Sequence, residues 1–374
     1  MARPVLRTRL CDMLGIEYPI LLAGMGSRGQ ATPPALVAAV SEAGGMGVVG
    51  GSGLPAEELQ RVIREVRKLT DKPIGVDLIL PASLAQGAGT TRTEVRRQLE
   101  EQFPEHVAFM TKLMKQYDLP EVYVDNEAVI STNLIEDQVR VVMAEDVQVF
   151  AAGLGDPSWV APQAHDKGII VLGLIGSPRH AQRQKEAGVD IVVAQGHEAG
   201  GHTGKIANFP LIPQVVDMVS PTPVTAAGGI ADGRGIAAAL SLGAIGVWLG
   251  TAFLVAEESA IGAVKQQAIL DGRSQDFEIR RVYTGKTMRG RTTAVTEAWD
   301  ASSLDPLPMP YQKIMMDDFN EAAMRAGRDD LVSNPSGQIG GMLNERKPAA
   351  EIMERLVQGT IETMRGLQAD VTIG

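Results

Sequence analysis

The chain has 374 residues, of which 44% are apolar and 21% are charged, and its formal net charge at pH 7 is −10. A chain of this length and composition is globular and can bury a large core in one or two domains. The negative charge argues against a nucleic-acid partner or an anionic membrane surface, and we expect neither a leader peptide nor a membrane span. The single cysteine, Cys11, excludes an internal disulfide and a cysteine-ligated metal site, so a reducing cytoplasm is the expected location.

Short apolar runs alternate with helical patterns along most of the chain. Eight such runs lie at residues 18–24, 46–51, 73–81, 147–153, 168–174, 189–196, 223–229 and 245–251. The amphipathic stretches between them end in glycine, as helices that connect parallel strands often do. This order predicts an α/β fold, a (β/α)8 TIM barrel, with a doubly wound open sheet as the rival fold. In either fold the ligand lies at the carboxyl ends of the strands.

The spacing of the runs also suggests how the chain is divided. Residues 1–256 are expected to form the barrel, with a charged helical excursion on its rim at about 82–146. Proline and glycine interrupt residues 257–341, which we interpret as a smaller, mostly helical subdomain on the substrate side. The rest, 342–374, contains a strong helical pattern that closes the structure, and packing of this helix back on the barrel is one option. Whether the excursion forms a lid stays open.

The first glycine motif, GMGSRG at residues 24–29, has the spacing of a dinucleotide-binding fingerprint and follows a predicted strand. That fold also needs an acidic residue at the end of the second strand, where this chain has Gly50, Gly51 and Ser52. The sequence at residues 32–34, Thr-Pro-Pro, starts the next helix late. The glycines are therefore expected to lead into a loop rather than to bind a dinucleotide.

A second glycine-rich segment, AQGHEAGGHTG at residues 194–204, follows the sixth predicted strand. Its histidines, His197 and His202, are five residues apart, so they do not match the His-Glu-x-x-His zinc motif, which places its histidines one helical turn apart. Gly200 and Gly201 make a poor helix interior, so the segment is predicted to be a loop. We expect no metal site here.

Two further glycine segments follow the seventh and eighth predicted strands. They are GGIADGRG at residues 228–235 and LGTAF at residues 249–253. In parallel barrels the loops at these two positions present backbone N–H groups to a phosphate, and glycine lets the backbone approach closely. Ordinary strand-to-helix turns are the alternative, but the occurrence of both segments together favours a phosphate site.

These segments, with LLAGMG at residues 21–26 and AGGMGVVGG at 43–51, resemble the FMN-dependent nitronate monooxygenases. They are equally similar to the related FMN-dependent enoyl-acyl-carrier-protein reductases. The resemblance extends from about residue 7 to residue 255, and its motifs do not separate the two branches. It implies a TIM barrel that binds FMN, a small-molecule substrate, and O2 or NAD(P)H as co-substrate. The oligomeric state stays open, with a homodimer as one option.

The resemblance also implies roles for individual residues. The FMN phosphate would lie on Gly228, Gly229, Gly250 and Thr251, the flavin ring against Ala23, Gly24 and Met25, and Gln195, Gly200 and Gly201 beside the cofactor. His202 would face the substrate as a base or as a stabiliser of an anion, because an imidazole titrates near neutral pH. His197 is expected to be a structural or solvated residue, and Glu198 to accept backbone N–H groups that shape the loop.

One cofactor-binding position departs from the family pattern. Asp77 stands where both branches usually have asparagine. A carboxylate close to the flavin would disfavour the anionic reduced cofactor and lower its midpoint potential. The alternative is that Asp77 pairs with a nearby cation or is protonated in the site.

Three functions therefore stay open. The first is FMN-dependent oxidation of alkyl nitronates by O2. The second is NAD(P)H-dependent reduction of an enoyl thioester through FMN. The third is a phosphate-binding barrel enzyme without flavin. A dehydrogenase that needs a cysteine nucleophile after strand six is nearly excluded, because Cys11 is the only cysteine.

Overall fold

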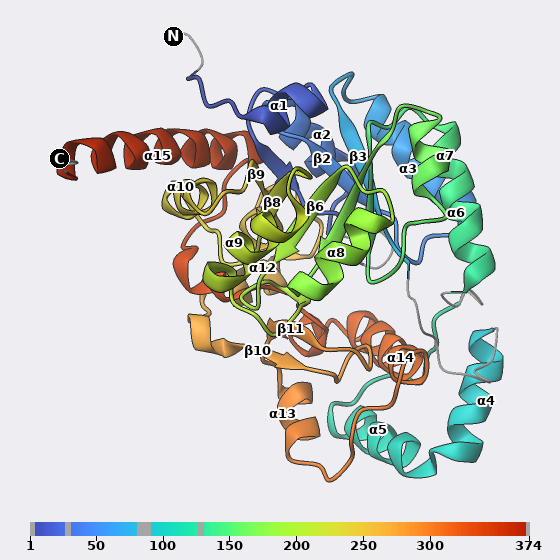
Figure 1. Cartoon of the computed structure of the whole chain (residues 1–374). Helices are drawn as coiled ribbons and strands as arrows, with labels where there is room; N and C mark the ends of the chain where they lie inside the picture. The colour runs from blue at the N-terminus through green and yellow to red at the C-terminus, as the bar shows by residue number, and fades with distance from the viewer. Residues whose placement is uncertain (1–3, 27–30, 81–90, 126–130, 372–374) are drawn as a thin grey trace.

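The structure is a computed structural model that describes residues 4–26, 31–80, 91–125 and 131–371. Eight parallel strands form a nearly closed barrel with helices around it (Figure 1). Their order is β1-β9-β8-β6-β5-β4-β3-β2, and a parallel bridge between Leu21 and Met46 joins the two ends of the sheet. The strands are β1 (Ile20–Leu22), β2 (Gly47–Gly50), β3 (Ile74–Ile79), β4 (Val149–Gly153), β5 (Ile170–Ile175), β6 (Ile191–Gln195), β8 (Val224–Ala227) and β9 (Gly246–Leu249). The predicted TIM barrel is confirmed.

The outer layer consists of helices whose apolar stripes face the strands. In α3 (Ala56–Arg67), for example, Leu59, Val62, Ile63 and Val66 are buried at helical spacing, while the opposite face is charged. The other helices of the barrel layer are α2 (Pro34–Glu42), α6 (Thr132–Ala144), α7 (Ala161–His165), α8 (Pro178–Glu186), α9 (Asn208–Val219), α10 (Gly233–Ser241) and the short α11 (Thr251–Leu254). Among the described residues, no helix has the length and apolar character needed to cross a membrane.

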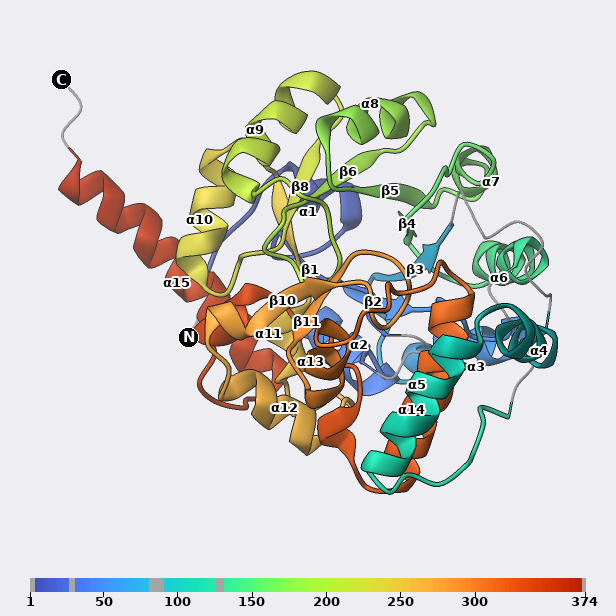
Figure 2. The same cartoon turned by 90° about the horizontal axis from the view of Figure 1, so that it is seen from below.

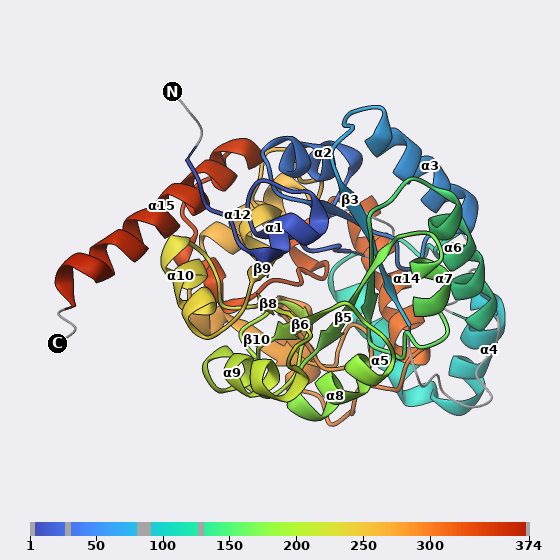
Figure 3. The ribbon, with the colours of Figure 1, turned by 45° about the horizontal axis from the view of Figure 1, so that its top comes forward.

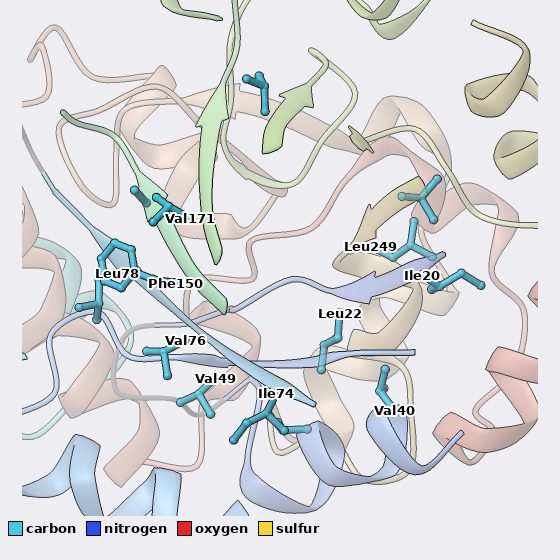
Figure 4. Close-up of a cluster of buried hydrophobic side chains, with 14 of the residues drawn as sticks. Ile20, Leu22, Val40, Val49, Ile74, Val76, Leu78, Phe150, Val171 and Leu249 are labelled. Atoms are coloured by element: carbon cyan, nitrogen blue, oxygen red, sulfur yellow. The ribbon is translucent and has the colours of Figure 1, made fainter. Parts of the chain in front are cut away.

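Successive side chains of a strand point to opposite faces, and this alternation places one site residue. Ile74, Val76 and Leu78 of β3 pack in the layer between strands and helices (Figure 4). Asp77 lies between two of them in the sequence, so its side chain points to the inside of the barrel. Most of the side chains packed inside the barrel are apolar, and α1 (Arg9–Leu14) packs against them with Leu10, Cys11 and Leu14.

A second hydrophobic core lies beside the barrel and joins two parts of the sequence. It contains Val95 and Leu99 from the rim excursion and Trp299, Ile314 and Phe319 from the carboxyl-terminal third. Figure 2 shows α5 lying beside α14 in this unit. We call the unit the cap; it comprises α4 (Arg92–Gln102), α5 (Pro104–Gln116), β10 (Phe277–Arg280), β11 (Met288–Arg291), α13 (Ala294–Asp300) and α14 (Tyr311–Arg325).

The carboxyl-terminal third is not only helical. Strands β10 and β11 form an antiparallel sheet with β7 (Gly201–His202). β7 lies in the glycine-rich segment at residues 194–204, which we call the glycine-histidine loop. Alternating polarity is hard to read in such short strands, so this sheet could not be predicted from the sequence. It ties the cap directly to the loop that carries His202.

The last part of the chain returns to the barrel. Helix α12 (Ala263–Leu270) follows the barrel, and α15 (Ala349–Asp370) ends the described chain. Met353, Leu356 and Val357 of α15 join the outer core of the barrel, next to α10 and α2. The second half of α15 extends away from the body of the molecule (Figure 3).

Candidate active site

A cavity of about 1860 Å³ lies at the carboxyl ends of the barrel strands, between the barrel and the cap. All the site residues that the sequence suggested line it: Ala23, Gly24, Met25, Asp77, Gln195, Gly200, Gly201, His202, Gly228, Gly229, Gly250 and Thr251. They come from β1, β3, β6, β8 and β9 or from the segments that follow these strands. The barrel therefore brings residues from five strands to one place, while their individual roles stay predictions.

The glycine-histidine loop is held on both sides. Gln195 at the end of β6 donates a hydrogen bond from Nε2 to the carbonyl oxygen of His202, at 2.8 Å. His202 pairs with Met288 of β11 in the small antiparallel sheet. A Cβ atom at Gly200 would lie 2.5 Å from the carbonyl carbon of Ser336, so only glycine fits where this segment crosses the loop. Gly200 is therefore needed because the backbone of residues 336–337 packs directly against it.

His202 lines the cavity, and its pKa differs strongly from that of a free histidine. Its Nε2 lies 3.1 Å from the hydroxyl oxygen of Thr284, a contact that fixes the orientation of the ring. Burial, together with the positive charges of Lys313 and Lys286, lowers the pKa of His202 from 6.5 to about 4. The imidazole is therefore neutral at pH 7.

His197 and Glu198 both form hydrogen bonds with backbone groups in or next to the loop. His197 Nδ1 lies 3.2 Å from the carbonyl oxygen of Gly204, and His197 does not line the cavity. Both carboxylate oxygens of Glu198 accept the backbone N–H of Asn208 at 3.1 Å. Glu198 therefore accepts a backbone N–H group, as predicted, but this group belongs to Asn208 at the start of α9 rather than to the loop itself.

The loops after β8 and β9 provide backbone donors to the cavity. Gly228 and Gly229 both have positive φ, +87° and +68°, a conformation that suits glycine. Within the described structure, the backbone N–H groups of Gly228, Gly229, Gly250 and Thr251 donate no hydrogen bond. A Cβ atom at Gly250 would lie 3.1 Å from the sulfur of Met25. Free N–H groups on a wall without side chains fit a phosphate group.

The amino terminus of α10 does not belong to this candidate phosphate cradle, because a side chain already caps it. Asp232 caps it, since its carboxylate accepts the N–H of Arg234 at 3.0 Å and that of Gly235 at 3.3 Å. A negative side chain already occupies this helix end. The candidate phosphate cradle is therefore confined to the loop after β8 and the start of α11.

The segment after β1 forms the opposite part of the wall. A Cβ atom at Gly24 would lie only 2.4 Å from Cβ of Asp77, so Gly24 gives Asp77 its space. Helix α2 starts late, with Pro33 as its amino-terminal cap. Residues 27–30 of the GMGSRG motif lie outside the described residues. The prediction that the described part of this motif leads into a loop is confirmed.

Asp77 is enclosed in the wall of the cavity. Burial raises the pKa of Asp77 from 3.8 to about 8. Among the described residues no lysine, arginine or histidine forms an ion pair with it. Of the alternatives that the sequence left open, the structure favours protonation, so Asp77 is mainly neutral at pH 7.

The cap supplies charged residues that the sequence did not reveal. Lys286 follows β10, Lys313 and Asp317 lie on α14, and Arg92 begins α4, and all four line the cavity. Asp317 accepts Lys313 Nζ at 2.9 Å and Arg92 Nη2 at 2.9 Å. Burial opposes the ionisation of Asp317, but Lys313 and Arg92 hold its pKa below the usual range. Arg92 and Asp317 are 225 positions apart in the sequence, so only the fold brings them together.

Comparison with known proteins agrees with this geometry. The family described as nitronate monooxygenase matches residues 7–359 of the chain. A protein of Mycobacterium tuberculosis that is named as a monooxygenase is 38% identical over 380 residues, covering 97% of this chain and 99% of its own length.

Two solved structures resemble the whole molecule. The structure of nitroalkane oxidase from Streptomyces ansochromogenes has a TM-score of 0.79 and 27% identity, and the match covers 96% of this chain and 99% of that chain. FabK from Thermotoga maritima has a TM-score of 0.77 and 31% identity, with 98% and 100% covered. With a barrel and a cap that match over nearly their full length and a family match of the same extent, the chain belongs to the nitronate monooxygenase family of oxidoreductases.

Proposed function

We propose that the chain is an FMN-dependent enzyme that oxidises alkyl nitronates with O2. The observation that carries the proposal is His202, a neutral imidazole in the same cavity as Lys313 and Lys286, whose barrel side holds N–H groups without a hydrogen-bond partner among the described residues. A nitronate is an anion, so the two lysines attract it. The neutral ring of His202 can form a hydrogen bond to it without adding a further positive charge.

The low pKa of His202 also favours the nitronate over the neutral nitroalkane as substrate. A base whose pKa is about 4 removes a proton from carbon more slowly than a histidine of ordinary pKa, so His202 acts on a neutral nitroalkane at a reduced rate. A nitronate has already lost that proton, whereas a neutral nitroalkane has not. The preformed nitronate is therefore the favoured substrate.

FMN, when bound, supplies the electron acceptor that O2 later reoxidises. The chain would hold its phosphate with the N–H groups of Gly228, Gly229, Gly250 and Thr251, and its ring next to Ala23, Gly24 and Met25. A protonated Asp77 puts no negative charge beside that ring at pH 7. The cap lies over this side of the barrel, on the other side of the cavity.

Two measurements test the proposal: the identity of the bound cofactor and the consumption of oxygen with nitronate substrates. Acid release and chromatography should give one FMN per chain, and oxygen consumption should be observed with preformed nitronates. FAD, or no flavin after reconstitution, would overturn the cofactor assignment. FMN without oxidation of any nitronate would overturn the reaction.

The second candidate is reduction of an enoyl thioester with NAD(P)H. The cavity of about 1860 Å³ is larger than the ~300–1000 Å³ of a usual small-molecule site, and a long acyl chain would use that space. The similarity to FabK over the whole chain supports this reading too. Bleaching of the flavin by NADH under nitrogen would favour the reductase, and bleaching by nitronate alone would favour the oxidase. A colourless protein would favour the third function, a phosphate-binding barrel enzyme without flavin.

A further inference from the structure

A segment of the cap at residues 282–286 lies next to the glycine-histidine loop and is held in place by buried contacts. Gln312 of α14 is fully buried, and its Nε2 donates a hydrogen bond to the carbonyl oxygen of Val282 at 2.6 Å. Gly285 has a φ of +75°, and a Cβ atom there would lie 2.8 Å from the backbone nitrogen of Met309. The side chains of this segment therefore approach the loop from a fixed backbone.

The hydroxyl group of Thr284, in this segment, makes three contacts. It accepts the backbone N–H of Lys286 at 3.2 Å and donates to the carbonyl oxygen of Lys286 at 3.3 Å. Nε2 of His202 lies 3.1 Å from the same hydroxyl oxygen. A hydroxyl group has one hydrogen and two lone pairs, so only a lone pair is left for His202 once the hydrogen points to Lys286. Nε2 then carries the hydrogen of the neutral imidazole ring.

The other ring nitrogen of His202, Nδ1, is left for a ligand. His202 lines the cavity, and none of the described residues forms a hydrogen bond with its Nδ1. When the ring hydrogen is on Nε2, Nδ1 has a free lone pair. A base needs such a lone pair to take a proton from carbon. The contact with Thr284 therefore decides which of the two nitrogens can act as the base.

Resting on the proposed function, we propose that Thr284 is a positioning residue that makes Nδ1 the nitrogen of His202 that exchanges a proton with the substrate. With a neutral nitroalkane, the C–H bond breaks, the proton forms a bond to Nδ1, and the electron pair moves into the nitro group to give the nitronate. The ring then carries a hydrogen on both nitrogens and is positively charged. The hydrogen bond that Nε2 donates to Thr284 stabilises this charged ring.

A preformed nitronate uses the same pair of residues with the hydroxyl group turned. When Thr284 donates to Nε2 instead of to the carbonyl oxygen of Lys286, the neutral ring of His202 carries its hydrogen on Nδ1 and donates it to a nitronate oxygen. The two forms of the ring need a partner at Nε2 that can both accept and donate. A hydroxyl group does both, whereas a methyl group does neither.

Nitrogen NMR of the flavin-loaded protein at pH 7, without substrate, tests the position of the ring hydrogen. The signals of His202 are those that disappear in His202→Asn. We expect Nε2 to carry the hydrogen and Nδ1 to be bare. Thr284→Val should shift the ratio of the two forms about fivefold towards hydrogen on Nδ1, because valine offers Nε2 no acceptor, and Thr284→Ser should keep the original ratio. Hydrogen on Nδ1 in the unmodified protein, or an unchanged ratio in Thr284→Val, would overturn the proposal.

Turnover of the two substrate forms gives a second measurement. In Thr284→Val, kcat/KM for a neutral nitroalkane should fall about tenfold or more, because the charged ring loses its acceptor, and Thr284→Ser should restore it. A preformed nitronate should lose about threefold, because the ring stays neutral. Thr287→Val is the matched control, since Thr287 lines the same cavity but His202 bonds to Thr284. It should leave the ratio of the two substrates unchanged. Equal losses for both substrates in Thr284→Val would mean that Thr284 has only a structural role.

The two measurements separate the role of Thr284 from the proposed reaction, because the NMR experiment needs no turnover. If no nitronate is oxidised but Thr284→Val moves the hydrogen of His202 as expected, Thr284 does position the ring and the proposed function fails. If nitronates are oxidised and Thr284→Val changes neither the ring hydrogen nor the ratio of the two substrates, the positioning role fails alone.

Discussion

The two sides of the cavity offer different parts of the chain to a ligand. The barrel side presents backbone N–H groups at Gly228, Gly229, Gly250 and Thr251. The cap side presents the charged side chains of Lys286, Lys313 and Arg92. Backbone donors are rigid and cannot titrate, which suits a cofactor that stays bound. Side chains can change without altering the fold, so the cap is where specificity for substrate can vary.

The largest expected effect is on the barrel side. Gly228→Ala places a Cβ atom 2.8 Å from that of Ala199 at a φ of +87°, so the cradle must distort. We expect FMN content after reconstitution to fall at least tenfold, because the N–H groups lose their common direction. Flavin absorbance per chain measures this.

Gly168→Ala is the control for the strain of the substitution itself. Gly168 has a φ of +71° with no atom within 4 Å of the added Cβ, and it lies outside the cavity. It should cost about 1 kcal/mol of stability and keep full flavin. Full flavin in Gly228→Ala as well would show that these N–H groups do not hold the cofactor.

The next largest effect is expected for the replacement of His202. His202→Asn should retain FMN but lower the turnover of neutral nitroalkanes by roughly a hundredfold or more, because asparagine cannot accept the proton. Preformed nitronates should suffer less. Steady-state oxygen consumption with both forms measures this. His197→Asn should have little effect, since His197 faces Gly204 and not the cavity. Equal losses in both variants would mean that the histidine is wrongly assigned.

These two sides also differ in how far the sequence could predict them. The barrel strands are short apolar runs with glycine at their carboxyl ends, so both the fold and the backbone cradle follow from local patterns. His202 could be found because it lies in the same glycine-rich segment. The pairing of β7 with β11 could not, because two-residue strands carry no periodicity.

The charged residues of the cap could not be predicted for a different reason. Arg92 and Asp317 belong to helices whose exposed faces are full of charges, and nothing local distinguishes a buried pair from a solvated one. Their meeting depends on α4 packing on α14, a long-range contact. Similarly, the sequence left the charge of Asp77 open, because burial alone decides it.

A smaller effect is expected when a cation of the cap that acts on the pKa of His202 is removed. Lys286→Met removes one of the two cations that lower the pKa of His202, so this pKa should rise from about 4 towards 6.5. Because the neutral ring is the working form, the acid limb of kcat/KM should move to higher pH, while the rate at pH 8 changes little. Nitrogen NMR of the histidine rings gives an independent reading. An unmoved acid limb and an unmoved resonance would show that Lys286 does not reach His202.

The smallest effect is expected for Asp77→Asn and concerns the midpoint potential of the flavin. Asp77 lies on the barrel side and becomes negatively charged only at high pH. With a pKa of about 8 it is protonated at pH 7, so Asp77→Asn replaces one neutral group by another, and the midpoint potential of the flavin should hardly change there. Above pH 8 the carboxyl ionises and repels electrons that enter the cofactor, so the potential of the unmodified enzyme should fall below that of the variant. The gap should reach tens of millivolts, since ~1 kcal/mol corresponds to roughly 20 mV for a two-electron couple. Potentiometric titration of both proteins at pH 6.5 and pH 9.5 measures it. A gap of equal size at both pH values would mean that Asp77 is already ionised at neutral pH, and no gap at either would mean that its charge does not reach the flavin.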